Sequence, residues 1–414
     1  MSIKGVKARE ILDSRGYPTI EVEILTAKGI FRADVPSGTS TGKFEAHELR
    51  DNQKKRYDGK GVKKAITAIN NISKKLIGMD PKNQKEIDMR LINLDGTIDK
   101  SSIGANALLG ISIAVCKAGA AESNMPLFEY IKKISGNKKI KMPTPLMLVL
   151  EGGSHANNSS DIQEFMIIPK AKNCTEKIRK GTEVYYAVKE MLEEKKFSTN
   201  VGYEGAFASP FEKNERVFEL LTTAIHKSKF AKKDFSFAID MAASELYDKK
   251  MKRYIFSAEK KSYDENGLIN YYNKLQKKFH IMSIEDGFEE NDWKSWKDFT
   301  KKTGKKLMIV GDDFLATNPA RIRKAIQEKS CNALLLKINQ IGTINESLEA
   351  YALAKKAGWK IIVSHRSGET TDSFIADFAV GIGADYVKFG APARGERTSK
   401  YNELLRIEEF VRNK

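Results

Sequence analysis

Short apolar segments that each end in a charged or polar residue recur through the second half of the chain, and this rhythm is the feature that most restricts its fold. The segments read FSFAID, HIMSIE, LMIVGD, ALLLK, KIIVSH and DYVK, and they end at Asp240, Glu285, Asp312, Lys337, His365 and Lys388. After a first interval of 45 residues, the ends follow at intervals of 27, 25, 28 and 23 residues. One strand, one helix and two short loops take about this length, so the rhythm predicts successive βα units of a barrel.

The residues that end these segments predict where a functional site lies. Functional side chains of βα barrels lie at the C-terminal ends of the strands, and here those ends hold three carboxylates, two lysines and a histidine. Carboxylates that share one barrel mouth repel one another unless a cation lies between them. The sequence therefore predicts a metal-dependent active site.

The rest of the chain predicts a second, smaller domain. We expect an α+β domain over residues 1–135 and the barrel over residues 136–414, with the polar stretch Gly136-Asn137-Lys138-Lys139 as the connector. Alternating residues from Ile20 to Val35 predict an antiparallel hairpin around residues 27–29. Helical patterns follow at residues 62–76, 84–94 and 104–123, and residues 401–411 predict an amphipathic helix packed on the barrel.

Composition restricts the cell compartment and the partners. The three cysteines are too few for a disulfide framework, the first residues lack the apolar core of a secretory signal, and no apolar stretch approaches the roughly 20 residues of a membrane span. We therefore expect a cytoplasmic protein without a membrane partner. The net charge of +17 is spread over lysine doublets, which is typical of a solvated surface. A polyanion-binding surface is the alternative, but no nucleic-acid motif supports it.

Two loops are rich in glycine and hydroxyl groups. Residues 36–42, PSGTSTG, suit a mobile lid that closes over an anion or a metal, although a plain surface loop has the same composition. Residues 151–158, EGGSHANN, carry His155 just before the apolar run that begins at Ile162. A single loop histidine is weak evidence by itself, so its meaning depends on what lies beside it.

Together these segments resemble the enolase family over essentially the whole chain. The matching segments occur in the family's order and read AREILDSRG, VPSGTSTG, NLDGT, GANALLG, GGSHA, DIQEFM, DMAASE, SIEDG, GDD, LLLKINQIGT, SHRSGET and LLRIEE. The resemblance implies a β3α4 N-terminal domain before a modified TIM-type barrel of the order ββαα(βα)6. It also implies reversible dehydration of 2-phosphoglycerate to phosphoenolpyruvate, with two Mg²⁺ ions, in a homodimer or octamer.

The resemblance assigns a role to each matching side chain. Asp240, Glu285 and Asp312 match the ligands of the first metal, and such an oxygen-only set suits magnesium better than zinc. Ser40 matches the ligand of the second metal, and Lys337 matches the base that removes the C2 proton. The remaining matches are the acid Glu204 with Glu164 and His155 beside it, the phosphate clamp Arg366 and Ser367, the carboxylate-binding Lys388, and the polar wall His365 and Gln163.

Two expectations about pKa follow from this set of residues. A lysine acts as a base near neutral pH only if its pKa is lowered, and we expect Mg²⁺ and Lys388 to lower that of Lys337. We expect Glu164 and His155 to raise the pKa of Glu204 or to orient its carboxyl group.

The chain departs from the family pattern at four positions. The family has asparagine where this chain has Glu151, aspartate at Tyr203, glycine at Ala206 and threonine at Phe389. These changes leave open two further hypotheses: another superfamily enzyme that takes an α-proton from a different carboxylate, or a weakly active homologue that binds a polyanion. Because every residue with direct chemistry is present, an active enzyme with altered loops is the interpretation that we favour.

Overall fold

A three-stranded antiparallel sheet begins the chain. The computed structural model describes residues 2–39, 42–156, 159–208 and 210–413. In it β1 (Gly5–Leu12), β2 (Pro18–Thr26) and β3 (Gly29–Asp34) pair in that order, and β2 and β3 form the predicted hairpin. The helices that follow are η1 (Tyr57–Gly59), α1 (Lys63–Ser73), α2 (Gln84–Asp95), α3 (Ala105–Glu122) and α4 (Leu127–Ile134). This is the β3α4 arrangement that the resemblance implies.

The helix α3 is the core of this first domain and contacts β2 and β3. By length and composition it could cross a membrane, with a mean hydropathy of 1.2, but 83% of it is buried within the protein, as in a core helix. Its glycine Gly110 lets the helix approach the sheet closely, because a Cβ there would lie 2.5 Å from Val22 Cγ2. The small-residue face of this segment therefore serves helix-on-sheet packing.

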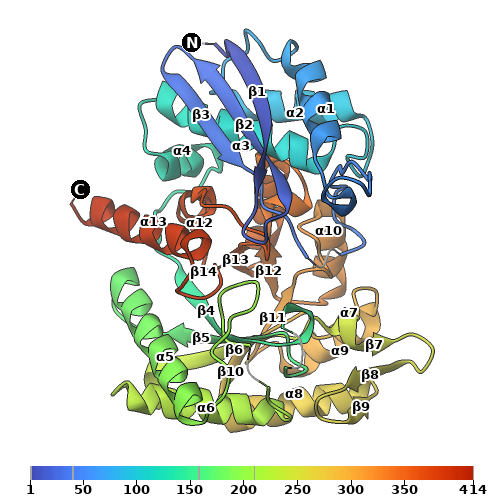
Figure 1. Cartoon of the computed structure of the whole chain (residues 1–414), viewed down its shortest axis with the longest axis vertical. Helices are drawn as coiled ribbons and strands as arrows, with labels where there is room; N and C mark the ends of the chain where they lie inside the picture. Colours follow the sequence, from blue (N-terminus) through green and yellow to red (C-terminus); the bar gives the residue numbers. More distant parts are fainter. Residues whose placement is uncertain (1, 40–41, 157–158, 209, 414) are drawn as a thin grey trace.

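Among the described residues, eight strands close into a barrel (Figure 1). They are β4 (Thr144–Glu151), β5 (Glu164–Pro169), β6 (Phe235–Asp240), β10 (Ile281–Glu285), β11 (Met308–Gly311), β12 (Ala333–Leu336), β13 (Lys360–Ser364) and β14 (Tyr386–Lys388). The strand β5 is antiparallel to both neighbours, and every other pair is parallel. The predicted fold, a modified TIM-type α/β barrel after a smaller α+β domain, is confirmed.

Helices surround the barrel in the order that the resemblance implies. Two of them follow the first two strands, α5 (Cys174–Glu194) and α6 (Asn214–Lys227). The others are α8 (Glu265–Phe279), α9 (Trp293–Thr303), α10 (Pro319–Glu328), α11 (Ile344–Lys356), α12 (Phe374–Ile382) and α13 (Gly395–Arg412). The described part of the barrel domain also contains three short 3-10 turns, η2 (Gly153–His155), η3 (Lys232–Asp234) and η4 (Ile338–Gln340).

An insertion explains the long first interval of the sequence rhythm. Between β6 and α8 the chain forms the short helix α7 (Ala243–Leu246) and a small sheet of β7 (Tyr247–Asp248), β8 (Arg253–Phe256) and β9 (Lys261–Tyr263). The first unit therefore needs more residues than its successors before the next barrel strand begins.

Strand direction decides which residues reach the barrel mouth. Parallel strands end at the same edge, so Asp240 pairs with Glu285 and Lys388 pairs with Ser364 in neighbouring strands. The antiparallel strand β5 starts at this edge instead, and its first residue, Glu164, pairs with Asp240. Strands of both directions therefore place charged side chains at one mouth.

The two domains share one continuous apolar core. The helix α4 packs against α12 (Figure 1). Both α2 and α3 contact α11. The approach of α4 and α12 is close enough that a Cβ at Gly381 would lie 2.7 Å from Ile131 Cβ. Polar contacts add to this interface: Lys117 Nζ lies 2.6 Å from Asp372 Oδ2, and Ser37 exchanges backbone hydrogen bonds with Gly368.

Candidate active site

Lys388 and three carboxylates meet at the barrel mouth. The Nζ atom of Lys388 lies 2.7 Å from Glu285 Oε1, 3.0 Å from Glu164 Oε2 and 3.1 Å from Asp240 Oδ2, and all four residues are buried. Burial lowers the pKa of Lys388, but the carboxylates outweigh burial and hold that pKa above its ordinary value. The lysine is therefore charged and is shared among three acids.

One lysine does not balance this negative charge. Burial, and next the Asp240 carboxylate, raise the pKa of Glu285 well above its ordinary value. Asp312, at the end of the neighbouring strand β11, brings a further carboxylate to the same mouth. Carboxylate oxygens are the ligands that Mg²⁺ prefers, so Asp240, Glu285 and Asp312 have the chemistry of a Mg²⁺ site. This trio is not among the groups of described residues whose ligand atoms all lie within 4.8 Å of one another, so its role as the first metal site stays a prediction.

Among the described residues, two groups of acidic or imidazole atoms lie close enough together to hold a metal ion. The ligand atoms of Asp286, Asp312 and Asp313 lie within 4.8 Å of one another, as do those of His155, Glu164 and Glu204. Ser40, which the resemblance assigns to a second metal, lies outside the described residues. The lid role of residues 36–42 therefore stays a prediction.

Lys337 follows β12 and is paired directly with Asp312. Its Nζ lies 2.5 Å from Asp312 Oδ2, and Gln340 Nε2 donates to Asp312 Oδ1 at 2.9 Å. Burial lowers the pKa of Lys337, but the Asp312 carboxylate outweighs burial and raises it. This direction is opposite to the lowered pKa that we expect with Mg²⁺ at the site, so that expectation stays a prediction. A cation held by Asp312 would compete with Lys337 for that carboxylate, and the positive charges of Arg366 and Lys388 already act to lower this pKa.

Asp286 supports this part of the site, although the sequence motifs assigned it no role. It directly follows Glu285, and its carboxylate accepts the backbone N–H groups of Asp312 at 2.9 Å and Asp313 at 2.8 Å. These bonds orient the turn that carries Asp312. The sequence does indicate Asp286 in one way: it is a second acid directly after a buried strand, in Glu285-Asp286-Gly287.

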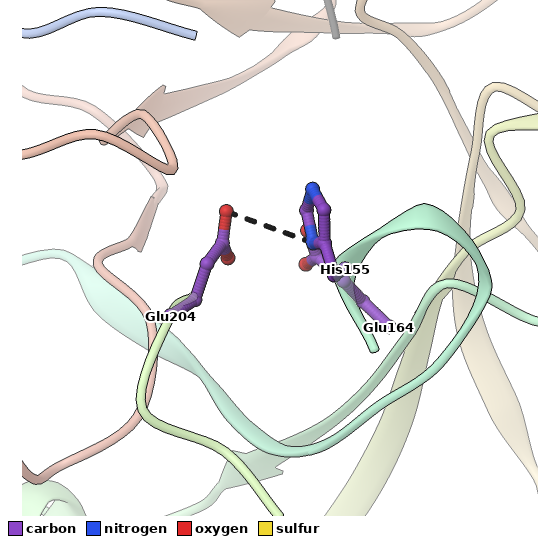
Figure 2. Close-up of side chains that lie close together, drawn as sticks. All are labelled: His155, Glu164 and Glu204. Atoms are coloured by element: carbon purple, nitrogen blue, oxygen red, sulfur yellow. Dashed lines mark ion pairs between the residues drawn. The ribbon is translucent and has the colours of Figure 1, made fainter. Parts of the chain in front are cut away.

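A second cluster combines Glu204 with His155 and Glu164. The Nδ1 atom of His155 lies 3.7 Å from Glu164 Oε1 and 3.8 Å from Glu204 Oε1, so its ring lies near both carboxylates (Figure 2). His155 lies on η2 and Glu164 begins β5, whereas Glu204 lies on the connection between α5 and α6. Burial lowers the pKa of His155 and favours its neutral form.

His365 is the closest partner of Glu204. Its Nε2 atom lies 3.0 Å from Glu204 Oε2, and both side chains are buried. Burial lowers the pKa of His365 to about 4, so the imidazole is neutral near pH 7. Burial raises the pKa of Glu204, but the two histidines outweigh it and hold that pKa below its ordinary value. This direction is opposite to the rise that we expected; the other expectation, that Glu164 and His155 orient the carboxyl group, stays a prediction.

Glu151, which departs from the family pattern, contacts the loop that carries Glu204. Its Oε1 accepts the backbone N–H groups of Glu204 at 3.0 Å and Ala206 at 2.8 Å, and its Oε2 has no hydrogen-bond partner among the described residues. Burial and the Glu204 charge raise the pKa of Glu151 to about 8. Near neutral pH it is therefore an uncharged acid, which accepts hydrogen bonds as an asparagine side chain would.

Two other departures from the family pattern, Tyr203 and Phe389, are not among the residues that line the cleft. The Tyr203 side chain is exposed, so its ring does not desolvate Glu204. Phe389 is fully buried and packs edge-on against Tyr401, with ring centroids 5.9 Å apart. Neither substitution removes a group from the cleft.

The clamp residues Arg366 and Ser367 follow β13. Arg366 Nη1 donates to Glu45 Oε2 at 2.8 Å and to Asn339 Oδ1 at 3.0 Å, and Nη2 donates to Glu45 Oε1 at 3.1 Å. Ser367 Oγ accepts the backbone N–H of Thr39 at 2.8 Å, which joins the clamp to the first domain. Glu45 was not predicted, because its role depends on a contact between the two domains.

One cleft is lined by every described residue of the predicted site except Glu285, which contacts the lining residue Lys388. Gln163 belongs to this lining, and its Oε1 accepts the hydroxyl of Ser154 at 2.6 Å. The lining residues from the prediction are His155, Gln163, Glu164, Glu204, Asp240, Asp312, Lys337, His365, Arg366, Ser367 and Lys388.

This barrel, with acids and lysines at its strand ends and an α+β domain packed against it, is the architecture of the enolase superfamily, whose members bind Mg²⁺. Two family models match the chain. The one described as the enolase N-terminal domain matches residues 3–131, and the one described as the enolase C-terminal TIM barrel domain matches residues 139–414. Together they cover nearly the whole sequence, and the chain belongs to the enolase family.

Proposed function

We propose that this chain catalyses the reversible dehydration of 2-phosphoglycerate to phosphoenolpyruvate, as a hydro-lyase of glycolysis and gluconeogenesis. The observation that carries the proposal is the content of one buried cleft. It holds a lysine beside acids with the chemistry of cation ligands, a glutamate whose Oε2 lies 3.0 Å from Nε2 of a neutral histidine, and an arginine–serine pair. These groups can supply a base, an acid and a phosphate clamp to one small substrate.

Lys337 is the proposed base. In its neutral form the Nζ atom takes the C2 proton, and the electron pair left on C2 forms the C2=C3 double bond as the C3–O bond breaks. Mg²⁺ held by Asp240, Glu285 and Asp312 would stabilise the negative charge that develops on the substrate carboxylate. Lys388 is charged and shared among acids, so it suits binding of that carboxylate rather than proton removal.

Glu204 is the proposed acid that gives a proton to the departing C3 hydroxyl, which leaves as water. Its low pKa means that the substrate-free protein holds it as a carboxylate. A bound anionic substrate acts in the opposite direction, because a nearby like charge favours the protonated form. In the hydration direction the carboxylate takes a proton from water instead.

The clamp favours a phosphorylated substrate over that of other superfamily members. A planar guanidinium binds phosphate through two parallel hydrogen bonds, and Arg366 is buried and positioned in the cleft. Glu45 now pairs with this guanidinium, so the phosphate must share it or displace Glu45. A substrate without phosphate would leave the pair of Arg366 and Glu45 unchanged.

Three further properties belong to the proposal. We propose two Mg²⁺ ions per site, with Ser40 holding the second, assembly into a homodimer or octamer, and a cytoplasmic location. Sedimentation of the purified chain measures the assembly. Calorimetric titration with Mg²⁺, in the presence and absence of substrate, measures the number of ions.

The test is formation of phosphoenolpyruvate by the purified protein, followed by its absorbance, from 2-phosphoglycerate and separately from glycerate. We expect turnover of the phosphorylated compound only. Equal turnover of glycerate would point to another superfamily reaction. A protein that turns over neither compound, yet binds a polyanion through its basic surface, would be the weakly active homologue.

A further inference from the structure

Arg397 is a buried charge that the reaction described above does not use. It lies on α13, and its side chain has no exposed surface. The guanidinium reaches four acceptors on two loops. Nη1 lies 2.7 Å from His365 Nδ1 and 2.6 Å from the carbonyl of Arg366, and Nη2 lies 2.6 Å from the carbonyl of Ser367 and 3.0 Å from that of Tyr203.

The chemistry of arginine decides which nitrogen of His365 carries the proton. A guanidinium donates hydrogen bonds and cannot accept one, so the Nδ1 atom that faces Nη1 must offer its lone pair. A neutral imidazole carries one N–H, which then lies on Nε2. That nitrogen is the one 3.0 Å from Glu204 Oε2.

The same contact opposes a charged imidazole. A second proton on Nδ1 would point at the Nη1 donor and would place two positive charges side by side in a buried site. Three charged groups act on this ring: Arg397 favours the neutral form, while Glu204 and Glu369 favour the charged form. Burial acts in the same direction as Arg397 and favours the neutral ring. The ring is closely packed on one side, because a Cβ at Gly390 would lie only 2.8 Å from His365 Cε1.

We propose that Arg397 is a positioning residue that fixes His365 as the neutral Nε2–H tautomer, so that the imidazole can present only a donor to Glu204, and Glu204 carries the reaction proton on its other oxygen, Oε1. The Oε2 atom lies 3.0 Å from the imidazole Nε2. The Oε1 atom faces His155 at 3.8 Å, within the cleft. The role of Glu204 rests on the proposed function, whereas the tautomer of His365 does not.

Arg397 also ties the loop of the acid to the loop of the clamp. Its bond to the Tyr203 carbonyl holds the residue before Glu204, and its bonds to the carbonyls of Arg366 and Ser367 hold the clamp. On the same helix, Lys400 pairs with Glu369 at 2.8 Å and steadies the far end of the clamp loop. One helix therefore sets the distance between acid and clamp.

The first test is a ¹⁵N spectrum of the imidazoles in the unaltered full chain, recorded from pH 5.5 to 8. The protein has five histidines, and a His365→Gln variant assigns the signal of interest by its loss. We expect His365 to show a bare Nδ1 and a protonated Nε2 that stay constant across this range. A proton on Nδ1, or an imidazolium at pH 7, would overturn the proposal without any reference to turnover.

The second test replaces Arg397 with methionine, which keeps much of the volume but has no donor. We expect His365 to populate both tautomers and its pKa to rise, with kcat reduced by about 10- to 100-fold and a smaller change in KM. The matched control is Arg406→Met on the same helix, where the arginine is exposed and pairs only with Glu403 among the described residues. An unchanged His365 spectrum in a folded Arg397→Met protein would contradict the proposal, and if that variant does not fold, the spectrum of the unaltered chain decides.

Discussion

The cation side and the acid side of the cleft are built in different ways. On the cation side, Asp240 and Glu285 end the neighbouring parallel strands β6 and β10 and pair in the ladder, and Asp312 directly follows the next strand, β11. On the acid side, Glu164 begins an antiparallel strand, His155 lies on a short helical turn, and Glu204 lies on a loop held from below by Glu151. Strand ends therefore carry the proposed metal ligands and the proposed base, while the proposed acid lies on a loop.

The largest expected effect is on the base. Lys337→Ala should lower kcat by about 10³- to 10⁴-fold, because general base catalysis contributes on this scale and the other lysine of the described cleft lining, Lys388, is held charged by three carboxylates. Exchange of the C2 proton with deuterium should stop while substrate binding remains measurable. Normal exchange in this variant would assign the base to another residue.

The cation side should be almost as sensitive. Asp312→Asn removes a charge from the predicted ligands and also releases Lys337, so we expect a loss on the order of 10³-fold in kcat/KM. EDTA should abolish the activity of the unaltered protein, and added Mg²⁺ should restore it. Full turnover in metal-free buffer would show that these carboxylates do not act through a metal ion.

A substitution on the acid side should slow loss of the hydroxyl group without slowing removal of the C2 proton. Glu204→Gln should slow dehydration by about 10²- to 10³-fold, because the acid is lost, while C2 exchange continues on the intact cation side. The two rates measured on one sample give the comparison directly. If exchange and dehydration fell together, the two sides would act as one unit.

The smallest effect is expected at Glu151, and it depends on pH. Its pKa is raised from the ordinary 4.5 to about 8, so the folded protein binds a proton that the unfolded chain releases between these values. Stability from this site therefore falls as the pH rises from about 4.5 to 8. Glu151→Gln copies the uncharged acid, and its melting temperature should match that of the parent near pH 5 and exceed it increasingly toward pH 8.

The control for this pH dependence is Glu193→Gln, which changes an exposed glutamate on α5. Its melting temperature should follow that of the unaltered protein at every pH. A constant difference between Glu151→Gln and the parent would mean that Glu151 is already ionised in the folded protein at pH 5.

The same contrast explains what could be predicted from the sequence. The ends of parallel strands recur at a nearly fixed interval, so the spacing alone places Asp240, Glu285 and Asp312 at one mouth. Glu164 breaks the rule because its strand runs the other way, and Glu204 has no periodic pattern around it. These two were found through the family's sequence motifs rather than through spacing.

The pKa directions of Lys337 and Glu204 in this arrangement are opposite to those expected from the sequence, for a related reason. The sign of each shift depends on which neighbour is nearest, and Lys337 faces Asp312 while Glu204 faces His365. Asp286, Glu45 and Arg397 were missed because each acts through contacts with backbone or with the other domain. Such contacts leave no repeat in the sequence, so only the folded chain reveals them.

The shared core of the two domains has a consequence for how the molecule denatures. The helix α4 is packed against α12 without room for one methyl group, and α2 and α3 cover α11. Neither domain can melt without exposing an apolar face of the other, so heating should give one calorimetric transition rather than two. Residues 139–414 expressed alone should leave the faces of α11 and α12 open to water, and the fragment should self-associate through them.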